Sequence, residues 1–159
     1  MFKKNDKFNL KIGKPVKADS RYIPEDPLNE FNEFEMGLKW YCYENNHYII
    51  LEIGDLKIDD IQLFPHVLSD LEAGLLKYSQ EFQQGQKLYF NFSEDKSLLA
   101  TRDKDKIICR LYSKTYEVKY SEFVRKFNGF FDSVLNTAIE KGYIKAEDAK
   151  KEIGWNPDD

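Results

Sequence analysis

Glu117 and Lys119 lie two positions apart in TYEVKYSEFVRKFNGFF (115–131), where an alternating pattern passes into a helical one. Side chains two apart in a strand point to the same face, so this acid and this lysine are predicted neighbours. A carboxylate placed there can bind Mg²⁺, and an ammonium beside it can stabilise negative charge or orient a water molecule. The preceding charged turn offers Asp103 or Asp105 as a further carboxylate.

This set resembles the metal site of nucleases of the restriction-endonuclease type, which place an Asp on one strand and Glu-x-Lys on the next. The resemblance implies Asp105, Glu117 and Lys119 as catalytic residues. However, Asp103 and Asp105 alternate with lysines in a turn, where such charges are common. Glu117 and Lys119 in turn form the polar side of a half-buried strand. We therefore predict no catalytic site here, and a metal-dependent nuclease is the alternative function.

Other motifs of metal or cofactor chemistry are missing from the sequence. His47, His66, Cys42 and Cys109 show no ligand spacing such as HxxxH or CxxC. A run of carboxylates around positions 52–60 lacks the spacing of a calcium loop. The sequence also has no nucleophile elbow, no phosphate loop and no dinucleotide fingerprint. We predict no metal, no cofactor and no enzymatic activity.

The composition is that of a globular protein. The 159 residues fit one domain over 1–159, and 42% of them are hydrophobic. Twelve Phe and ten Tyr favour strands, a large core or an aromatic binding surface. No apolar run approaches the ~20 residues that cross a bilayer, and the basic N-terminus lacks the apolar stretch of a secretory signal. We expect buried, reduced cysteines, no membrane association and a cytoplasmic location.

Charge is unevenly distributed along the chain. Residues 1–24 carry seven Lys/Arg and two Asp, a local charge of +5, whereas residues 25–60 carry ten Asp/Glu and two Lys, a local charge of −8. An acidic region repels nucleic acid and attracts basic proteins, or it keeps an aromatic-rich domain soluble. If it binds a partner, aromatic anchors and steering carboxylates are the expected contacts. These are Glu30, Phe31, Glu33, Phe34, Asp55, Asp59 and Asp60; Phe31 and Phe34 have the alternative role of closing the edge of the core.

Periodicity predicts the elements. Residues 1–7 are expected to be disordered, and 13–35 form an irregular acidic segment interrupted by prolines. Strands are predicted where apolar and polar residues alternate, at 8–12, 36–44, 47–53, 87–93, 97–101, 107–113 and 115–120. Helices are predicted at 63–85 and from 121 to about 142, followed by a short helix at 145–155.

This order predicts an α+β fold. We expect one antiparallel sheet of about six to seven strands, with two longer helices and a short C-terminal helix packed on one face. The other face would then display tyrosines, including Tyr41, Tyr43, Tyr48, Tyr89 and Tyr112. The edge of the strand at 8–12 could pair with a second copy, which makes a homodimer possible.

In its size, its acidity and its order of strands and helices over residues 36–142, the chain resembles small bacterial immunity proteins, which protect cells from delivered toxins. The resemblance implies a cytoplasmic α+β protein that neutralises a cognate toxin by covering its active site or a neighbouring surface. The predicted function is therefore a non-catalytic protein-binding module, with a basic protein as its partner.

Overall fold

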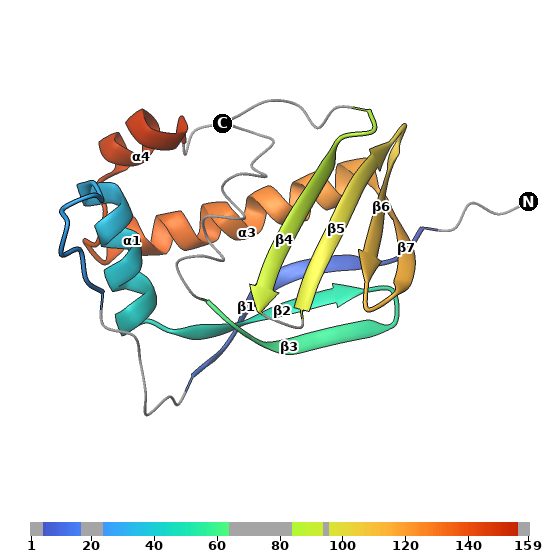
Figure 1. Cartoon of the computed structure of the whole chain (residues 1–159), viewed down its shortest axis with the longest axis horizontal. Helices are drawn as coiled ribbons and strands as arrows, with labels where there is room; N and C mark the ends of the chain where they lie inside the picture. The colour runs from blue at the N-terminus through green and yellow to red at the C-terminus, as the bar shows by residue number, and fades with distance from the viewer. Residues whose placement is uncertain (1–4, 17–23, 64–83, 94–95, 156–159) are drawn as a thin grey trace, which may run out of the picture.

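A computed structural model describes residues 5–16, 24–63, 84–93 and 96–155 (Figure 1). One sheet contains β1 (Phe8–Pro15), β2 (His47–Ile53) and β3 (Leu56–Gln62). A second sheet contains β4 (Lys87–Ser93), β5 (Lys96–Asp103), β6 (Lys106–Leu111) and β7 (Lys114–Lys119). The helices are α1 (Glu33–Glu44), α3 (Tyr120–Glu140) and α4 (Ala146–Ile153).

The α+β class is confirmed, but the strands are not arranged as one sheet. Within the described residues they form two antiparallel sheets, in the orders β1-β2-β3 and β4-β5-β6-β7. Only two residues of the sequence separate each strand of the second sheet from the next, and each strand pairs antiparallel with the one that precedes it. The predicted helix at 63–85 falls almost entirely on residues 64–83, outside the described part of the chain.

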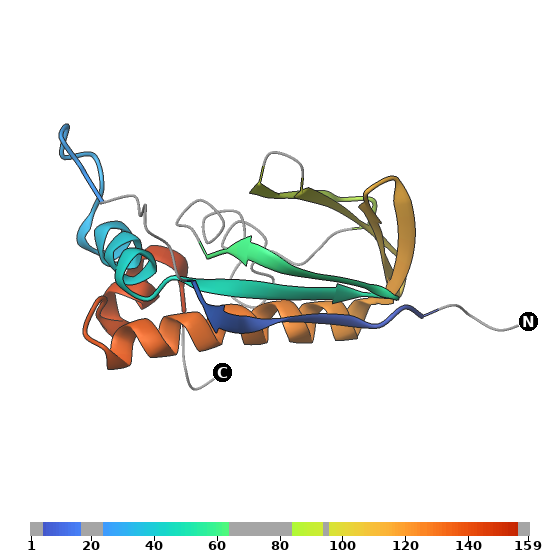
Figure 2. The same ribbon diagram turned by 90° about the horizontal axis from the view of Figure 1, so that it is seen from below.

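The two sheets meet where β7 passes the start of β1 (Figures 1 and 2). The backbone N–H of Asp6 donates to the carbonyl oxygen of Glu117 at 2.6 Å. The N–H of Glu117 donates in return to a carboxylate oxygen of Asp6 at 2.9 Å. A second link joins the sheets elsewhere, where Lys96 Nζ lies 2.8 Å from a carboxylate oxygen of Asp60. Residues 6 and 7, expected to be disordered, thus make backbone hydrogen bonds, since the carbonyl of Lys7 accepts from the N–H of Gly54.

The long helix α3 packs against both sheets. The ring of Phe123 lies 4.8 Å from that of Phe8 on β1, and the ring of Phe127 lies 5.3 Å from that of Phe90 on β4 (centroid distances). Apolar residues recur at three- and four-residue steps along α3 and are buried, as the sequence predicts. The two sheets and α3 therefore enclose one hydrophobic core.

The segment 36–44 is the main error of the sequence prediction, because it is part of helix α1 and not a strand. The side chain of Asn32 accepts a hydrogen bond from the N–H of Glu35, and the Glu35 side chain accepts one from the N–H of Asn32. This capping box satisfies N–H groups that a helix start leaves unpaired. The predicted tyrosine-bearing sheet face is wrong in part for the same reason: Tyr41 is on α1 and buried.

Strand β3 was not predicted, because its alternation is interrupted. Ile49 pairs with Ile61 and Leu51 pairs with Ile58, so β3 has one residue more than β2 between these pairs. This bulge leaves two consecutive residues, Asp59 and Asp60, on the exposed side. Two adjacent polar residues in a sequence suggest a loop, although here they continue a strand.

None of the helices in the described residues is long and apolar enough to cross a membrane.

Candidate binding surfaces

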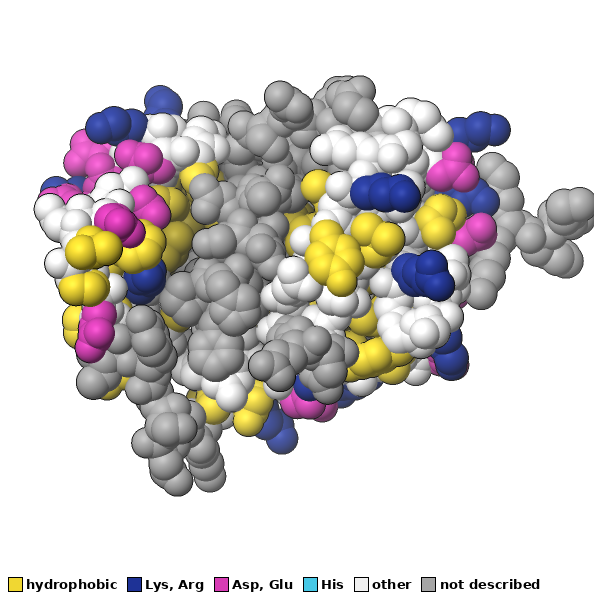
Figure 3. Space-filling model, in the orientation of Figure 1, with side chains coloured by type: hydrophobic (Ala, Val, Ile, Leu, Met, Phe, Trp, Pro, Cys, Tyr) yellow, Lys and Arg dark blue, Asp and Glu magenta, His cyan; other side chains and the backbone are white. Residues whose placement is uncertain are grey.

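The end of the molecule that carries α1 displays acidic and apolar side chains next to each other (Figure 3). We call this region the acidic end, and it consists of the loop 24–32 and the outward side of α1. Glu25, Glu30 and Glu33 are exposed, and Leu28 between them is 74% exposed. None of these three glutamates forms an ion pair with any residue that the structure describes.

The loop of the acidic end is held in a defined conformation by Asp26. One carboxylate oxygen of Asp26 accepts from the N–H of Glu30 at 2.8 Å, and the other accepts from the N–H of Phe31 at 3.1 Å. Asn29 adopts a left-handed backbone conformation with φ 53°, and its N–H donates to the carbonyl oxygen of Asp26 at 3.1 Å. The apolar tip at Leu28 is thus presented by a folded turn, which lowers the entropy lost when it is covered by a partner.

Helix α1 adds exposed aromatic surface to the acidic end. Its inward stripe follows a helical period, with Phe34, Leu38 and Tyr41 buried. Trp40 lies outside this stripe and is 38% exposed; its ring makes an edge contact with that of Tyr43 at a centroid distance of 5.7 Å. Tryptophan and tyrosine supply large contact areas at low cost in conformational entropy.

The two predicted aromatic anchors differ: Phe34 takes the alternative role of closing the core, and Phe31 stays partly accessible. Phe34 is 3% exposed and belongs to the hydrophobic core, so it is not a contact residue. Phe31 is half-buried, and the Nζ of Lys39 lies 3.6 Å above the centre of its ring. Such a cation–π contact covers one ring face. Of the two phenylalanines, only Phe31 therefore offers surface to a partner.

The remaining predicted carboxylates belong to another part of the molecule. Asp55, Asp59 and Asp60 follow the end of β2, whereas α1 precedes its start. Asp55 lies in the turn at the far end of the seven-residue β2, about 20 Å along the strand at ~3.3 Å per residue. Strand β3 runs back antiparallel to β2, so Asp59 and Asp60 lie beside Ile50 in the middle of β2. Asp60 is paired with Lys96, while Asp55 and Asp59 are exposed. The acidic segment 25–60 thus provides two separate groups of carboxylates.

Glu52 is already neutralised within the molecule. Its carboxylate oxygens lie 3.2 Å from Lys7 Nζ and 3.4 Å from Lys11 Nζ. The hydrogen bond from Lys7, with Lys11 adding to it, lowers the pKa of Glu52 below its usual value. Glu44 at the end of α1 likewise accepts a hydrogen bond from the Tyr143 hydroxyl at 2.9 Å.

Two residues of the alternative nuclease site, Glu117 and Asp105, have other partners. Glu117 lies 3.5 Å from the ammonium of Lys106, and its backbone pairs with Asp6. The backbone carbonyl of Asp105 accepts a hydrogen bond from the N–H of Tyr120. Lys119, which precedes Tyr120 in the chain, is exposed. Across the described residues, no three His, Cys, Asp or Glu side chains form a group that could hold a metal ion.

The histidine and cysteines in the described residues have structural positions. The ring Nδ1 of His47 lies 3.1 Å from the carbonyl oxygen of Gly13. Cys42 and Cys109 are buried free thiols, as expected, and burial raises the pKa of each to about 12. A thiol in this environment is unreactive near neutral pH. His66 lies outside the described residues.

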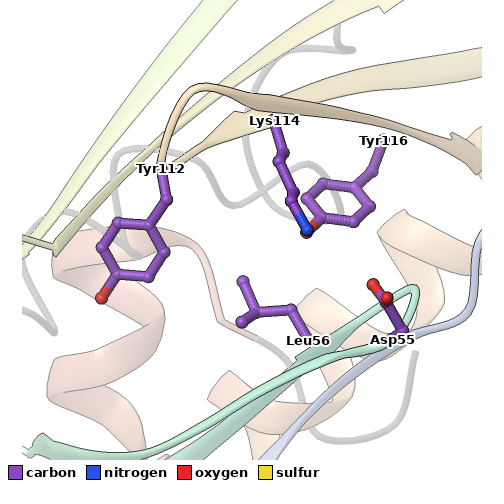
Figure 4. A pocket seen from close by; sticks show the side chains of 5 residues that line it. All are labelled: Asp55, Leu56, Tyr112, Lys114 and Tyr116. Atoms are coloured by element: carbon purple, nitrogen blue, oxygen red, sulfur yellow. The ribbon is translucent and has the colours of Figure 1, made fainter.

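A shallow pocket of about 220 Å³ lies between two hairpin turns (Figure 4). Asp55 in the turn after β2 and Leu56 at the start of β3 form one wall, and Tyr112, Lys114 and Tyr116 form the other. Alternation along β7 places Lys114 and Tyr116 on the same face of that strand, and Figure 4 shows both reaching toward the β2–β3 turn.

Tyr116 is held in this pocket wall by a glycine of the opposite turn. Gly54 has φ +58°, and a Cβ placed on it would lie 2.9 Å from two ring atoms of Tyr116. Only glycine therefore permits both this turn and the close approach of the ring. The Tyr116 hydroxyl is buried and has no hydrogen-bond partner in the described part of the chain.

A second hollow, of about 260 Å³, lies between β1 and α3. Its cations are Lys11, Arg125 and Lys126. Lys11 is paired with Glu52 and Arg125 with Glu122, at 3.4 and 2.9 Å. Three cations in the lining suggest an anion-binding site. Because two of them already pair with glutamates of the same molecule, this hollow is a weak candidate for binding an anion.

Sequence reasoning missed Leu28 and Trp40 on the acidic end and Lys114 and Tyr116 in the pocket. Leu28 follows Pro27 in an irregular stretch, and nothing in the pattern shows that it is exposed. Trp40 was placed on a strand, although the Asn-x-x-Glu sequence that begins at Asn32 is a helix-start signal that would have placed it on a helix. The pocket residues come from two hairpins in different sheets, which no local pattern brings together.

Comparison with protein-family models, with curated proteins and with solved structures finds no match to this chain.

Proposed function

We propose that this protein is a non-catalytic binding module that uses the acidic end to dock on a basic surface of another protein. The observation that carries the proposal is the juxtaposition of exposed apolar side chains with carboxylates that form no ion pair within the described part of the chain. Glu25 and Glu30 lie on either side of Leu28 in the sequence of the folded loop, Glu33 begins α1, and Trp40 adds exposed apolar area on α1. Interfaces are built in this way, with apolar anchors at the centre and charges at the rim.

Charge supports a basic partner. Residues 24–44 contain six Asp/Glu and one Lys, a net charge of −5 within this segment. Carboxylates at the rim of an interface mainly raise the association rate through long-range attraction, and salt screens this attraction over about 8–10 Å. Binding through the acidic end should therefore weaken as the salt concentration rises, chiefly through slower association.

A bacterial toxin is the partner class that we propose. The size, the acidity and the α+β class resemble those of immunity proteins, which act by covering a toxin and need no catalytic group of their own. A basic nuclease toxin would suit the acidic end, because surfaces that bind phosphate backbones are positively charged.

Two charge-reversal variants test which carboxylates bind the partner. Glu30→Lys/Glu33→Lys changes the acidic end, and Asp55→Lys/Asp59→Lys makes the same charge change on the β2–β3 hairpin. Wild type and both variants are used to capture proteins from cells of the source, and candidates are then purified for binding measurements. We expect the first variant to raise the dissociation constant at least tenfold, or ~1.4 kcal/mol, and the second to leave it within a factor of about two.

Leu28→Asp provides an independent check on the apolar contact. The side chain is 74% exposed, so this change should leave the free energy of unfolding within about 0.5 kcal/mol while it weakens partner binding. The proposal is wrong if a purified partner binds all variants as it binds wild type, or if no protein is retained specifically by the wild type.

A further inference from the structure

The pocket between the hairpin turns has opposite charges on facing walls that do not neutralise each other. Asp55 comes from the β2–β3 turn and Lys114 from the start of β7. Both are exposed, and neither forms an ion pair with a residue in the described ranges. A carboxylate and an ammonium that line one hollow in this way are both available to a ligand that carries the complementary charges.

A buried hydroxyl group adds a second and independent sign of a ligand. Tyr116 is 5% exposed, and its hydroxyl has no hydrogen-bond partner within the part of the chain that the structure describes. The ring packs closely against Gly54, where a Cβ would lie 2.9 Å from two of its atoms. Buried polar groups without a partner are rare in proteins and unfavourable. An acceptor atom of a ligand in the pocket that Tyr116 lines would supply the missing hydrogen bond.

The size and the remaining walls define the rest of the ligand. A volume of about 220 Å³ equals that of roughly seven water molecules and lies below the usual range for drug-sized ligands. Leu56 is half-buried, and the Tyr112 ring is 48% exposed at the rim. Together they offer a small apolar contact beside the charged groups.

We propose that this pocket binds a small zwitterion, a free α-amino acid with an apolar side chain. The α-carboxylate accepts hydrogen bonds from Lys114 and Tyr116, and the α-ammonium donates to Asp55. The side chain packs on Leu56 and Tyr112. This inference does not depend on the docking surface, which lies at the other end of β2.

A titration of the full-length protein with defined probes tests the ligand class. L-phenylalanine and L-leucine are added to ¹⁵N-labelled protein, and amide shifts are followed by NMR. We expect saturable shifts centred on Asp55 and Lys114. Phenethylamine lacks the carboxylate and 3-phenylpropionate lacks the ammonium, so each should bind at least about fivefold more weakly than L-phenylalanine, since each loses one charged contact. No saturable shift with either amino acid overturns the proposal, and so does equal binding of all the probes.

Tyr116→Phe separates a binding role from a structural one. The variant keeps the ring against Gly54 and removes only the hydroxyl, so the ligand-free protein should be as stable as wild type or more stable. Its affinity for L-phenylalanine should fall about five- to tenfold. Tyr89→Phe is the control, because the Tyr89 hydroxyl is at hydrogen-bond distance (3.0 Å) from Ser97 on an exposed face, and its loss should not change affinity. Unchanged affinity in Tyr116→Phe contradicts the assignment, and so does a loss of stability in its ligand-free form.

Discussion

At Gly37 the backbone of α1 approaches the α3–α4 loop so closely that no side chain fits. A Cβ at this position would lie 2.2 Å from the carbonyl oxygen of Tyr143 and 2.6 Å from Cγ2 of Ile144. A clash with backbone cannot be relieved by turning a side chain. Gly37 therefore fixes how α1 rests on the body of the protein, and with it the position of the acidic end.

Gly37→Ala should therefore destabilise the protein, although alanine is the better helix former. We expect the free energy of unfolding to fall by at least about 2 kcal/mol, as measured by urea denaturation, because the added methyl group forces α1 and the loop apart. Gly129→Ala is the matched control: a Cβ on Gly129 in α3 meets nothing within 4 Å, so helix propensity alone should raise stability by about 0.5–1 kcal/mol. Equal effects of the two substitutions would contradict this account.

Among whole elements, α1 depends most on its first turn. The capping box between Asn32 and Glu35 is the feature that distinguishes this helix from a strand in the sequence. Asn32→Ala should lower the free energy of unfolding by about 1 kcal/mol in thermal or urea denaturation, because it leaves N–H groups at the helix start unpaired.

Asn136→Ala serves as the control for this change. Asn136 is exposed in the interior of α3, where alanine has the higher helix propensity. The substitution should be neutral or slightly stabilising. A loss of stability at Asn136 as large as that at Asn32 would show that capping is not the cause.

Elements with one strong period could be predicted from the sequence, whereas those with a mixed pattern could not. The buried positions of α3 and the alternation in β2 and β4–β7 appear directly in the spacing of apolar residues. In α1, Met36, Leu38, Trp40 and Cys42 alternate as in a strand, and the helical stripe that begins at Phe34 uses some of the same residues. The spacing of apolar residues alone does not distinguish a helix from a strand here, whereas the capping box at Asn32 and Glu35 does.

The candidate surfaces depended on tertiary structure that the sequence does not carry. The acidity of residues 25–60 is a property of the sequence, but the fold places their carboxylates on two different parts of the molecule, the acidic end and the β2–β3 hairpin. Exposure of Leu28 and burial of Phe34 follow from how α1 rests on the body. Local patterns describe each element and contain no information about such contacts.

For the whole molecule, the two thiols predict how stability changes with pH. Cys42 is on α1 and Cys109 on β6, and burial in the core raises the pKa of each to about 12. In the unfolded chain both thiols ionise near pH 8.5–9. Between about pH 9 and 12 the folded state therefore binds more protons than the unfolded state, and the free energy of unfolding falls as pH rises. Below pH 8 these thiols should have no effect.

Urea denaturation at pH 7, 9 and 10.5 measures this dependence, and the double variant Cys42→Ala/Cys109→Ala should show a smaller fall above pH 9. In parallel, a thiol reagent at pH 8 should label the native protein only at the rate at which it unfolds. Labelling of the native state at the rate of an unfolded peptide would contradict the burial of these thiols.

The link between the sheets joins residues that are far apart in the chain, since Asp6 bonds to Glu117 across 111 positions and Phe8 packs on Phe123. During synthesis, at ~5–20 residues per second, the first strand is made on the order of ten seconds before the residues that cover it. Over that interval Phe8 and the free edge of β1 have no native partner in β7 or α3. This nascent strand is therefore exposed to aggregation while the ribosome completes the rest.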